Sequence, residues 1–368
     1  MIETRIERLL LQLIAPVVAI GFAALLAAGI LHFTGADAGM VLGEVVAFGT
    51  TPASLVAVVN KATTFYLAGI AGAIGFRMLL FNIGIDGQYR LAVFFAAVVG
   101  ASVSLPPVIH VAFIIVVAMA VGAGWAAIAG YLKVTRGVSE VISTIMLNAV
   151  ATGIIAYLLA PGRLAERIEG SNNIRTTPIP PSGWLPGFDF QGREVFGFTL
   201  VAMVMGIAFW VLLNRTRFGF ELRASGLSLR AAAVSGVNSK RMIFITMVMS
   251  GAMAGLVGIP QLLGSSHQYG LDFPAGFGFT GLAIAILGRN HPLGVAFGAL
   301  LWAWLERAAQ ILDLLGVSRE IVTIMQATIV LSVVVAYEVV RRVNVRRQQK
   351  LDGRAALEPA EEEGRIST

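Results

Sequence analysis

A short polar segment between two apolar runs holds the side chains best suited to bind a ligand. Residues 81–88 are Phe-Asn-Ile-Gly-Ile-Asp-Gly-Gln, so Asn82, Asp86 and Gln88 bring two amides and a carboxylate close together. The two glycines predict a break in a helix, and backbone groups freed by such a break have to pack in protein or line an aqueous cavity. The alternative is a simple loop at a membrane surface.

Amide and aromatic side chains also lie inside other apolar runs. Amides can pair with the edges of a nucleobase or with sugar hydroxyls, and an aromatic ring can stack on a base. We therefore predict a pathway for a neutral ligand, although for each residue taken alone a hydrogen bond between helices is the simpler interpretation. The predicted pathway residues are Asn82, Asp86, Gln88, Asn148, Phe277 and Gln326.

Other kinds of chemistry have no matching residues. The sequence has no cysteine, and its four histidines include no pair spaced for a metal on one helix face. It has no Gly-x4-Gly-Lys-Ser/Thr segment to hold ATP, and Gly276-Phe-Gly-Phe-Thr-Gly281 lies in an apolar hairpin without the strand and helix of a dinucleotide site. We expect no catalytic residues, no metal and no cofactor bound by this chain, hence a protein that is not an enzyme.

The composition predicts that these polar residues lie in a membrane. Hydrophobic residues make up 57% of the 368 and charged residues 13%, against about 25% charged in soluble domains, which excludes a soluble or disordered chain. A membrane span needs roughly 20 apolar residues. We predict an all-α polytopic membrane protein with about ten transmembrane helices, near residues 11–33, 54–80, 88–104, 108–132, 138–160, 196–213, 243–263, 276–288, 292–312 and 321–340.

The basic residues indicate how these spans are oriented. With the N-terminus inside, ten spans place 20 of the 27 lysines and arginines on the cytoplasmic side, Arg90 among them, as membrane proteins prefer. Nine or eleven spans would move one of the two large basic segments outside. We predict that both termini are cytoplasmic and that the pI near 10.0 reflects this topology, with no nucleic acid as partner.

Few charged residues lie within the predicted spans. Lys61 is close enough to the outer end of its span to extend toward the surface, and we predict a local ion pair between Glu306 and Arg307. No acidic cluster marks a path for protons or sodium ions. This argues against transport driven by an ion gradient, so we consider an ion-coupled secondary transporter the weaker alternative for the function of this chain.

An internal repeat divides the chain. Residues 137–146 and 316–325 share seven of ten positions at an offset of 179 residues, and each segment opens a long apolar helix. In the ten-span order these two helices run in opposite directions, so we predict two inverted five-helix repeats, an arrangement typical of transporters. The alternative is a chance similarity between two apolar helices.

The largest basic loop is too polar to span a membrane. Within residues 214–242 we predict a short helix over about 227–235, ended by Gly236. Small side chains at Ala231 and Ala232 would let another protein approach closely. The alternative is a basic helix lying on anionic lipid headgroups.

One transmembrane domain is the predicted organisation. Its two halves are joined through an external loop, and a charged cytoplasmic tail follows. The predicted boundaries are 1–342 for the domain, about 1–160 and 196–342 for the halves, 161–195 for the external loop, 214–242 for the cytoplasmic coupling loop and 343–368 for the tail.

At these segments the chain resembles the membrane permease subunits of bacterial ABC importers for simple sugars and nucleosides, within the branched-chain amino acid permease superfamily. Residues 82–88 resemble that family's Asn-Ile-Gly-x-Glu-Gly-Gln motif, with Asp86 in place of the usual glutamate. Residues 140–148, Glu-Val-Ile-Ser-Thr-Ile-Met-Leu-Asn, resemble the nucleoside subgroup. The resemblance covers nearly all of residues 5–342.

The resemblance implies a subunit that forms the pathway for nucleosides while partner subunits hydrolyse ATP with Mg²⁺. A simple-sugar permease of the ribose or galactose type is the alternative. The implied partners are ATP-binding subunits, a second identical or homologous permease and an extracytoplasmic substrate-binding lipoprotein, all at the bacterial inner membrane. The residues implied to couple this chain to the ATPase are Glu221, Arg223, Gly226, Ala231, Ala232 and Gly236.

Overall fold

The computed structural model describes residues 20–33, 35–167, 173–336 and 342. Arg5, Arg8 and the predicted tail 343–368 lie outside this part, as do the two termini that were predicted to be cytoplasmic. The chain divides into two compact units, residues 45–310 and residues 1–44 with 311–368.

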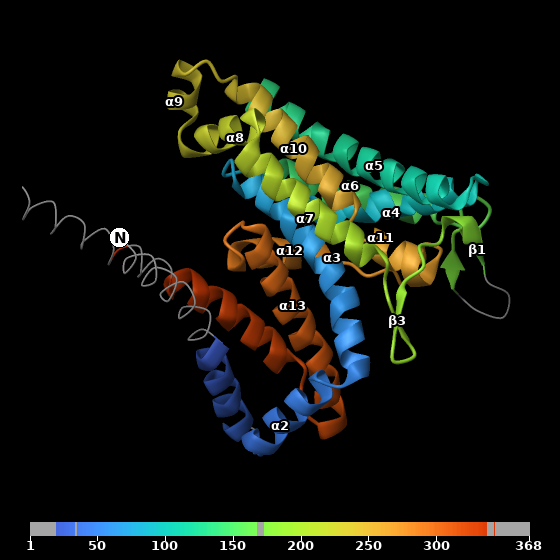
Figure 1. The fold of residues 1–368 in the computed structure, drawn as a ribbon, viewed down its shortest axis with the longest axis vertical. Helices are drawn as coiled ribbons and strands as arrows, with labels where there is room; N and C mark the ends of the chain where they lie inside the picture. The colour runs from blue at the N-terminus through green and yellow to red at the C-terminus, as the bar shows by residue number, and fades with distance from the viewer. Residues whose placement is uncertain (1–19, 34, 168–172, 337–341, 343–368) are drawn as a thin grey trace, which may run out of the picture. The chain divides into compact units, whose positions relative to one another are not determined.

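Residues 45–310 form a bundle of helices (Figure 1). In chain order they are α3 (Pro52–Phe76), α4 (Ile85–Ala101), α5 (Pro107–Arg136), α6 (Glu140–Leu158), α7 (Phe198–Arg215), α8 (Arg217–Leu227), α9 (Leu229–Val234), α10 (Ser239–Gly255), α11 (Ile259–Gln261), a π-helical turn (Leu262–Ser266), α12 (Phe277–Leu287) and α13 (Pro292–Ala308).

The other unit contains the helices Ile20–Phe33 and Glu320–Ala336. Two elements cross the boundary between the units: α2 (Ala38–Gly49), where no helix was predicted, and a 3₁₀ helix (Ala309–Leu315).

Each of the ten predicted apolar runs overlaps a helix in the described part of the chain. Six helical segments there are long and apolar enough to cross a membrane. They are Pro52–Phe76, Pro107–Arg136, Glu140–Leu158, Phe198–Arg215, Ser239–Ser266 and Pro292–Leu315. The segments near 88–104 and 276–288 form shorter helices, as their short apolar runs predicted.

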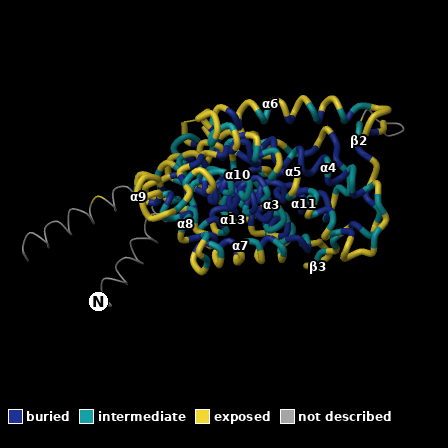
Figure 2. Tube along the Cα trace, turned by 90° about the horizontal axis from the view of Figure 1, so that it is seen from above, coloured by how far each residue is buried: buried dark blue, intermediate teal, exposed yellow. Residues whose placement is uncertain are grey.

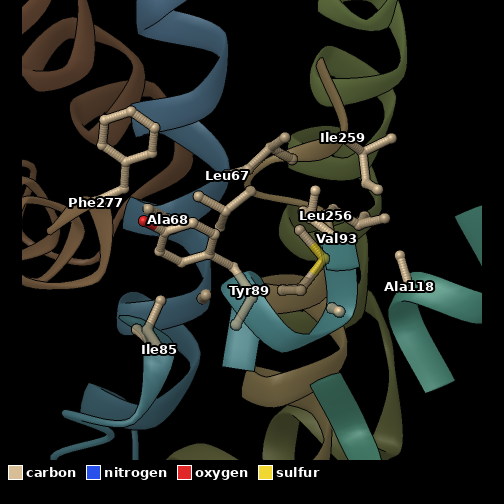
Figure 3. Close-up of a cluster of buried hydrophobic side chains, with 14 of the residues drawn as sticks. Leu67, Ala68, Ile85, Tyr89, Val93, Ala118, Leu256, Ile259 and Phe277 are labelled. Atoms are coloured by element: carbon tan, nitrogen blue, oxygen red, sulfur yellow. The ribbon is translucent and has the colours of Figure 1, made fainter. Parts of the chain in front are cut away.

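The core of the larger unit surrounds α3. This helix begins where the Thr51 hydroxyl caps it and Pro52 sets its first turn, and it packs against α10, α12 and α13. Figure 2 shows the central helices largely buried, with α6 at the margin of the bundle. Leu67 of α3 and Leu256 after α10 belong to one apolar cluster with Tyr89 of α4 (Figure 3).

Glycines let α5 and α10 approach to backbone contact, and the two helices lie side by side in Figure 1. A Cβ atom at Gly122 would lie 2.3 Å from the carbonyl oxygen of Gly251, and one at Gly255 would lie 2.2 Å from the carbonyl oxygen of Ala118. The Gly-x-x-x-Gly spacing in α10 therefore forms a close-packing face, as such spacing does between membrane helices.

The predicted external loop adds strands to the all-α expectation. Two antiparallel ribbons form, β1 (Glu166–Arg167) with β2 (Ile174–Arg175) and β3 (Phe188–Phe190) with β4 (Arg193–Val195). The segment between the ribbons is held on the loop that follows α11, because the backbone nitrogens of Thr176 and Ile179 donate to the carbonyls of Tyr269 and His267 at 2.8 Å.

The short helix predicted over about 227–235 is α9, and a second helix that was not predicted, α8, ends just before it at Leu227. Ser228 starts α9 with an extended backbone and a hydroxyl that accepts from the Ala231 nitrogen at 3.2 Å. This N-cap serine separates the two helices. Gly236 follows the end of α9 with a φ of +82°, the left-handed conformation predicted for a terminating glycine.

The α5–α10 contact gives a test of the packing. Gly122→Ala should lower the stability of the bundle by about 1–3 kcal/mol, because the new methyl meets the α10 backbone. Gly124→Ala on the same helix meets nothing within 4 Å and should be neutral or slightly stabilising. Thermal unfolding midpoints of the two variants in detergent measure the difference, and equal midpoints would contradict the packing described.

Candidate functional site

Two interrupted helices meet near the centre of the larger unit. The first interruption, residues 77–84, separates α3 from α4. The second, residues 267–276, separates the π-helical turn after α11 from α12. Both interruptions leave backbone N–H and C=O groups without the hydrogen bonds that a continuous helix would give them, and polar side chains form those bonds instead.

Asn82 and Gln88 bind each other at the first interruption. The Asn82 amide nitrogen donates to the Gln88 side-chain oxygen and to the Ser250 hydroxyl, both at 2.9 Å, and the Gln88 amide nitrogen donates back at 2.9 Å. Ser250 in turn donates to the carbonyl of Ala71 at 2.7 Å. All three polar side chains are buried, so this network ties the interruption to α10 and α3.

Asn148 supports the same interruption from α6. Its side-chain oxygen accepts from the Gly87 nitrogen and its amide nitrogen donates to the Ile83 carbonyl, each at 2.9 Å. Gly87 has no room for a side chain, because a Cβ there would lie 2.7 Å from the Asn148 oxygen. A single amide thereby satisfies one donor and one acceptor of the interrupted backbone.

Asp86 joins the first interruption to the second. Its carboxylate oxygen accepts from the Gly276 nitrogen at 2.7 Å and lies 3.5 Å from the Gly278 nitrogen. These are among the first nitrogens of α12, where a helix favours a negative charge. Gly276 has a φ of +92°, and a Cβ at Gly278 would lie 2.4 Å from the Asp86 nitrogen, so glycine is required at both positions.

Phe277 packs within the protein beside Asp86. Its ring stacks on Tyr89 with centroids 5.8 Å apart, and Figure 3 labels both residues. It also makes an edge-to-face contact with the Phe65 ring, with centroids 5.5 Å apart. The Tyr89 hydroxyl donates to the Pro274 carbonyl at 2.7 Å, which holds the second interruption over α4. Phe277 is 8% exposed, so its stacking partner here is Tyr89 and its predicted stacking on a base remains a prediction.

A charged pair lies beside these rings and differs from the predicted one. Glu306 of α13 pairs with Lys61 of α3 at 2.6 Å, and the Lys61 ammonium lies 5.7 Å from the centroid of the Phe277 ring. Arg307 instead donates to the Ser54 hydroxyl at 3.1 Å. The predicted Glu306–Arg307 pair is wrong because adjacent residues on a helix point in different directions.

Arg90 is part of a helix, although the orientation count assigned it to a cytoplasmic loop. It lies within α4, and its guanidinium donates to the Thr152 hydroxyl of α6 at 3.1 Å. Sequence reasoning missed it because a charge near a polar interruption was counted as part of a loop. The available signal was its position two residues after Gln88, inside the short apolar run.

The predicted coupling residues divide between exposed and packed positions. Ala231 and Gly236 are exposed, and Glu221 pairs with the exposed Arg217 at 2.9 Å. Ala232 is buried. Gly226 packs on the first interruption, because a Cβ atom at Gly226 would lie 2.0 Å from the carbonyl oxygen of Arg77.

Arg77 links this packed part of α8 to the second interrupted helix. Its carbonyl is the group that Gly226 touches, and its guanidinium donates to the Asn290 carbonyl after α12 at 2.7 Å. Burial and the nearby Arg223 guanidinium lower the pKa of Arg77 from its usual value. Arg223 thus lies near the interruption, on the same side of α8 as Gly226 three residues later.

Gln326 belongs to the other unit. It is buried in the helix Glu320–Ala336, whereas the five other predicted pathway residues belong to the larger unit. Of those five, Asn82 and Gln88 bond each other, Asp86 and Phe277 meet at the start of α12, and Asn148 bonds Gly87. Their predicted contacts with a ligand remain a prediction.

An apolar groove of about 650 Å³ lies away from the polar centre, between α3, α7 and α13. Thr63, Tyr66, Trp210 and Leu300 are among its lining residues. Such a surface suits hydrocarbon and offers little to a hydroxylated ligand. Within the described residues no group of three metal-ligating side chains occurs.

Known proteins share the sequence of this chain over most of its length. A family model described as the permease component of a branched-chain amino acid transport system matches residues 54–335. The guanosine ABC transporter permease protein NupP of Bacillus subtilis is 32% identical over 91% of this chain and 95% of its own. The glucose ABC transporter permease protein TsgB13 of Haloferax volcanii is 31% identical over 77% and 76%, and the nucleoside ABC transporter permease protein NupB of Lactococcus lactis 27% identical over 74% and 76%. No solved structure matches the chain.

The bond from Asp86 to the start of α12 can be tested by stability. Asp86→Leu should cost about 1–3 kcal/mol, because it leaves the partly buried Gly276 nitrogen without its acceptor. Asp86→Asn keeps an oxygen at this place and should cost less. As a matched control, Asp189 accepts from the Gly192 nitrogen in an exposed turn, so Asp189→Leu should change the unfolding midpoint little. Similar losses for both leucine variants would contradict the role described.

Proposed function

The chain belongs to the family of permease components of branched-chain amino acid transport systems, and we propose that it forms the translocation pathway for nucleosides in an ATP-driven importer. It is a multi-pass membrane protein, and the bacterial inner membrane is its proposed location. The observation that carries the proposal is the polar centre, in which buried amides and the Asp86 carboxylate that caps α12 meet between two interrupted helices.

The names of the relatives support the nucleoside assignment. NupP and NupB are described as guanosine and nucleoside permeases, and NupP matches nearly the whole chain. TsgB13 is described as a glucose permease, so a simple sugar is the second candidate. Both classes are neutral and hydroxylated, which fits a polar centre built from amides.

The proposed topology has ten spans in two inverted five-helix repeats, with both termini in the cytoplasm. In support, a long helix, an interruption and a shorter helix occur twice, in α3–α4 and in α10–α12. Asp86 joins the shorter helix of one set to that of the other. Transporter sites of this kind lie where interrupted helices of two repeats meet.

The proposed partners follow from the lack of an ATP-binding motif in this sequence. ATP-binding subunits, carrying ATP and Mg²⁺, would dock on the loop 214–242, whereas a second permease subunit and a substrate-binding lipoprotein would complete the importer. Exposed apolar side chains of this loop, Leu227 and Val234, support the docking. The contact of Gly226 with the Arg77 carbonyl connects the loop to the first interruption.

Reconstitution tests the transport mechanism. Proteoliposomes that contain the complete importer should take up labelled guanosine only with its ATP-binding subunits and ATP, because this chain supplies the pathway and the partners supply the energy. Uptake by this chain alone under a proton or sodium gradient would support the secondary-transporter alternative and contradict the proposal. Uptake of ribose or galactose without uptake of nucleosides would support the sugar alternative.

The docking surface is best tested at its exposed side chains. Ala231→Glu and Val234→Glu should lower ATP-dependent uptake at least about tenfold, as changes at the centre of an interface do, and leave the unfolding midpoint unchanged. Ala232→Glu is the contrast, because it buries a charge and should lower the midpoint as well. Normal uptake by both exposed variants would remove this surface from the docking site.

A further inference from the structure

Arg90 is a charged residue within the short helix α4. It lies five residues after the start of α4 and eleven before its end, so about 16 Å of helix separate it from Ala101. Its partner Thr152 is twelve residues into α6, about 18 Å from Glu140. The nearer helix ends, Ile85 of α4 and Leu158 of α6, are about 8 Å and 9 Å away, so the guanidinium lies one to two turns from the first interruption.

The guanidinium has more donors than the protein uses. One nitrogen donates to the exposed Thr152 hydroxyl, while the buried Nε–H has no partner among the described residues. The Tyr269 hydroxyl accepts a second hydrogen bond from the same guanidinium. Arginine has five N–H donors and no acceptor, so the N–H groups of Arg90 that have no partner in the protein can bind the acceptor atoms of a ligand.

The charge of Arg90 is offset one helical turn away. Asp86 lies four residues earlier on α4, hence on the same side of the helix, and its carboxylate is engaged by Gly276 at the start of α12. The local charge is therefore close to zero, which favours a neutral ligand. A charged side chain within a membrane bundle lies toward its interior or toward a water-filled path, and Arg90 is partly exposed at the side of α6 that carries Thr152.

We infer that Arg90 contacts the transported nucleoside and favours 6-oxopurines such as guanosine, a step that rests on the proposed function. The planar guanidinium can donate two parallel hydrogen bonds to a pair of neighbouring acceptors. Guanine offers such a pair in O6 and N7, whereas adenine offers N7 beside an amino donor. Adenosine can accept one of these bonds and guanosine both.

Paired uptake measurements on the complete importer test this assignment. With wild-type partner subunits, Arg90→Gln should lower the maximal rate of guanosine uptake about tenfold relative to that of adenosine, the discrimination expected of one bidentate contact. Arg90→Lys should recover part of the preference, because lysine donates without the planar fork. Arg193→Gln, at an exposed position of β4, is the control and should leave both rates unchanged.

The possible outcomes separate this inference from the function on which it rests. Equal losses for guanosine and adenosine in Arg90→Gln, with normal amounts of assembled importer, would assign Arg90 a structural role and overturn the inference alone. Wild-type importer that takes up neither nucleoside would overturn the proposed function and the inference together. A changed guanosine-to-adenosine ratio is the result expected, and a loss of folding does not produce it.

Discussion

Unpaired backbone groups inside an apolar bundle are the constraint on which the rest of this structure depends. Two helices stop near its centre, and in hydrocarbon each free N–H or C=O would cost several kcal/mol. Asp86 accepts from the start of α12, and Asn148 serves both a donor and an acceptor at the first interruption. The polar side chains in the core are thus required by the interruptions before any ligand is considered.

The same constraint determines where small residues occur. Gly87 and Gly278 lie where the amide and carboxylate must approach the backbone, and any side chain would displace them. Gly122 and Gly251 let α5 and α10 touch, which holds the α10 serine that anchors Asn82. Polar bonding and close packing therefore reinforce each other around one centre.

Much of this arrangement could be predicted from the sequence, because hydropathy sets the helices and glycines with amides mark an interruption. The segment 82–88 was identified in this way, with Asn82, Asp86 and Gln88 as its polar residues. The partners of Lys61 could not be identified, since Glu306 lies on a distant helix and only the fold brings them together. The position of Arg90 within α4 was missed for a related reason, since counting charges by loop assigns a side but no position along a helix.

The contact between α8 and the first interruption has a mechanical consequence. Gly226 meets the Arg77 carbonyl with main chain alone, so no rotatable side chain lies between the two segments. Side chains absorb small displacements by changing rotamer, but a backbone contact has little such compliance. A shift of α8 toward the bundle would therefore move residues 77–84 by nearly the same amount, as a stiff joint does.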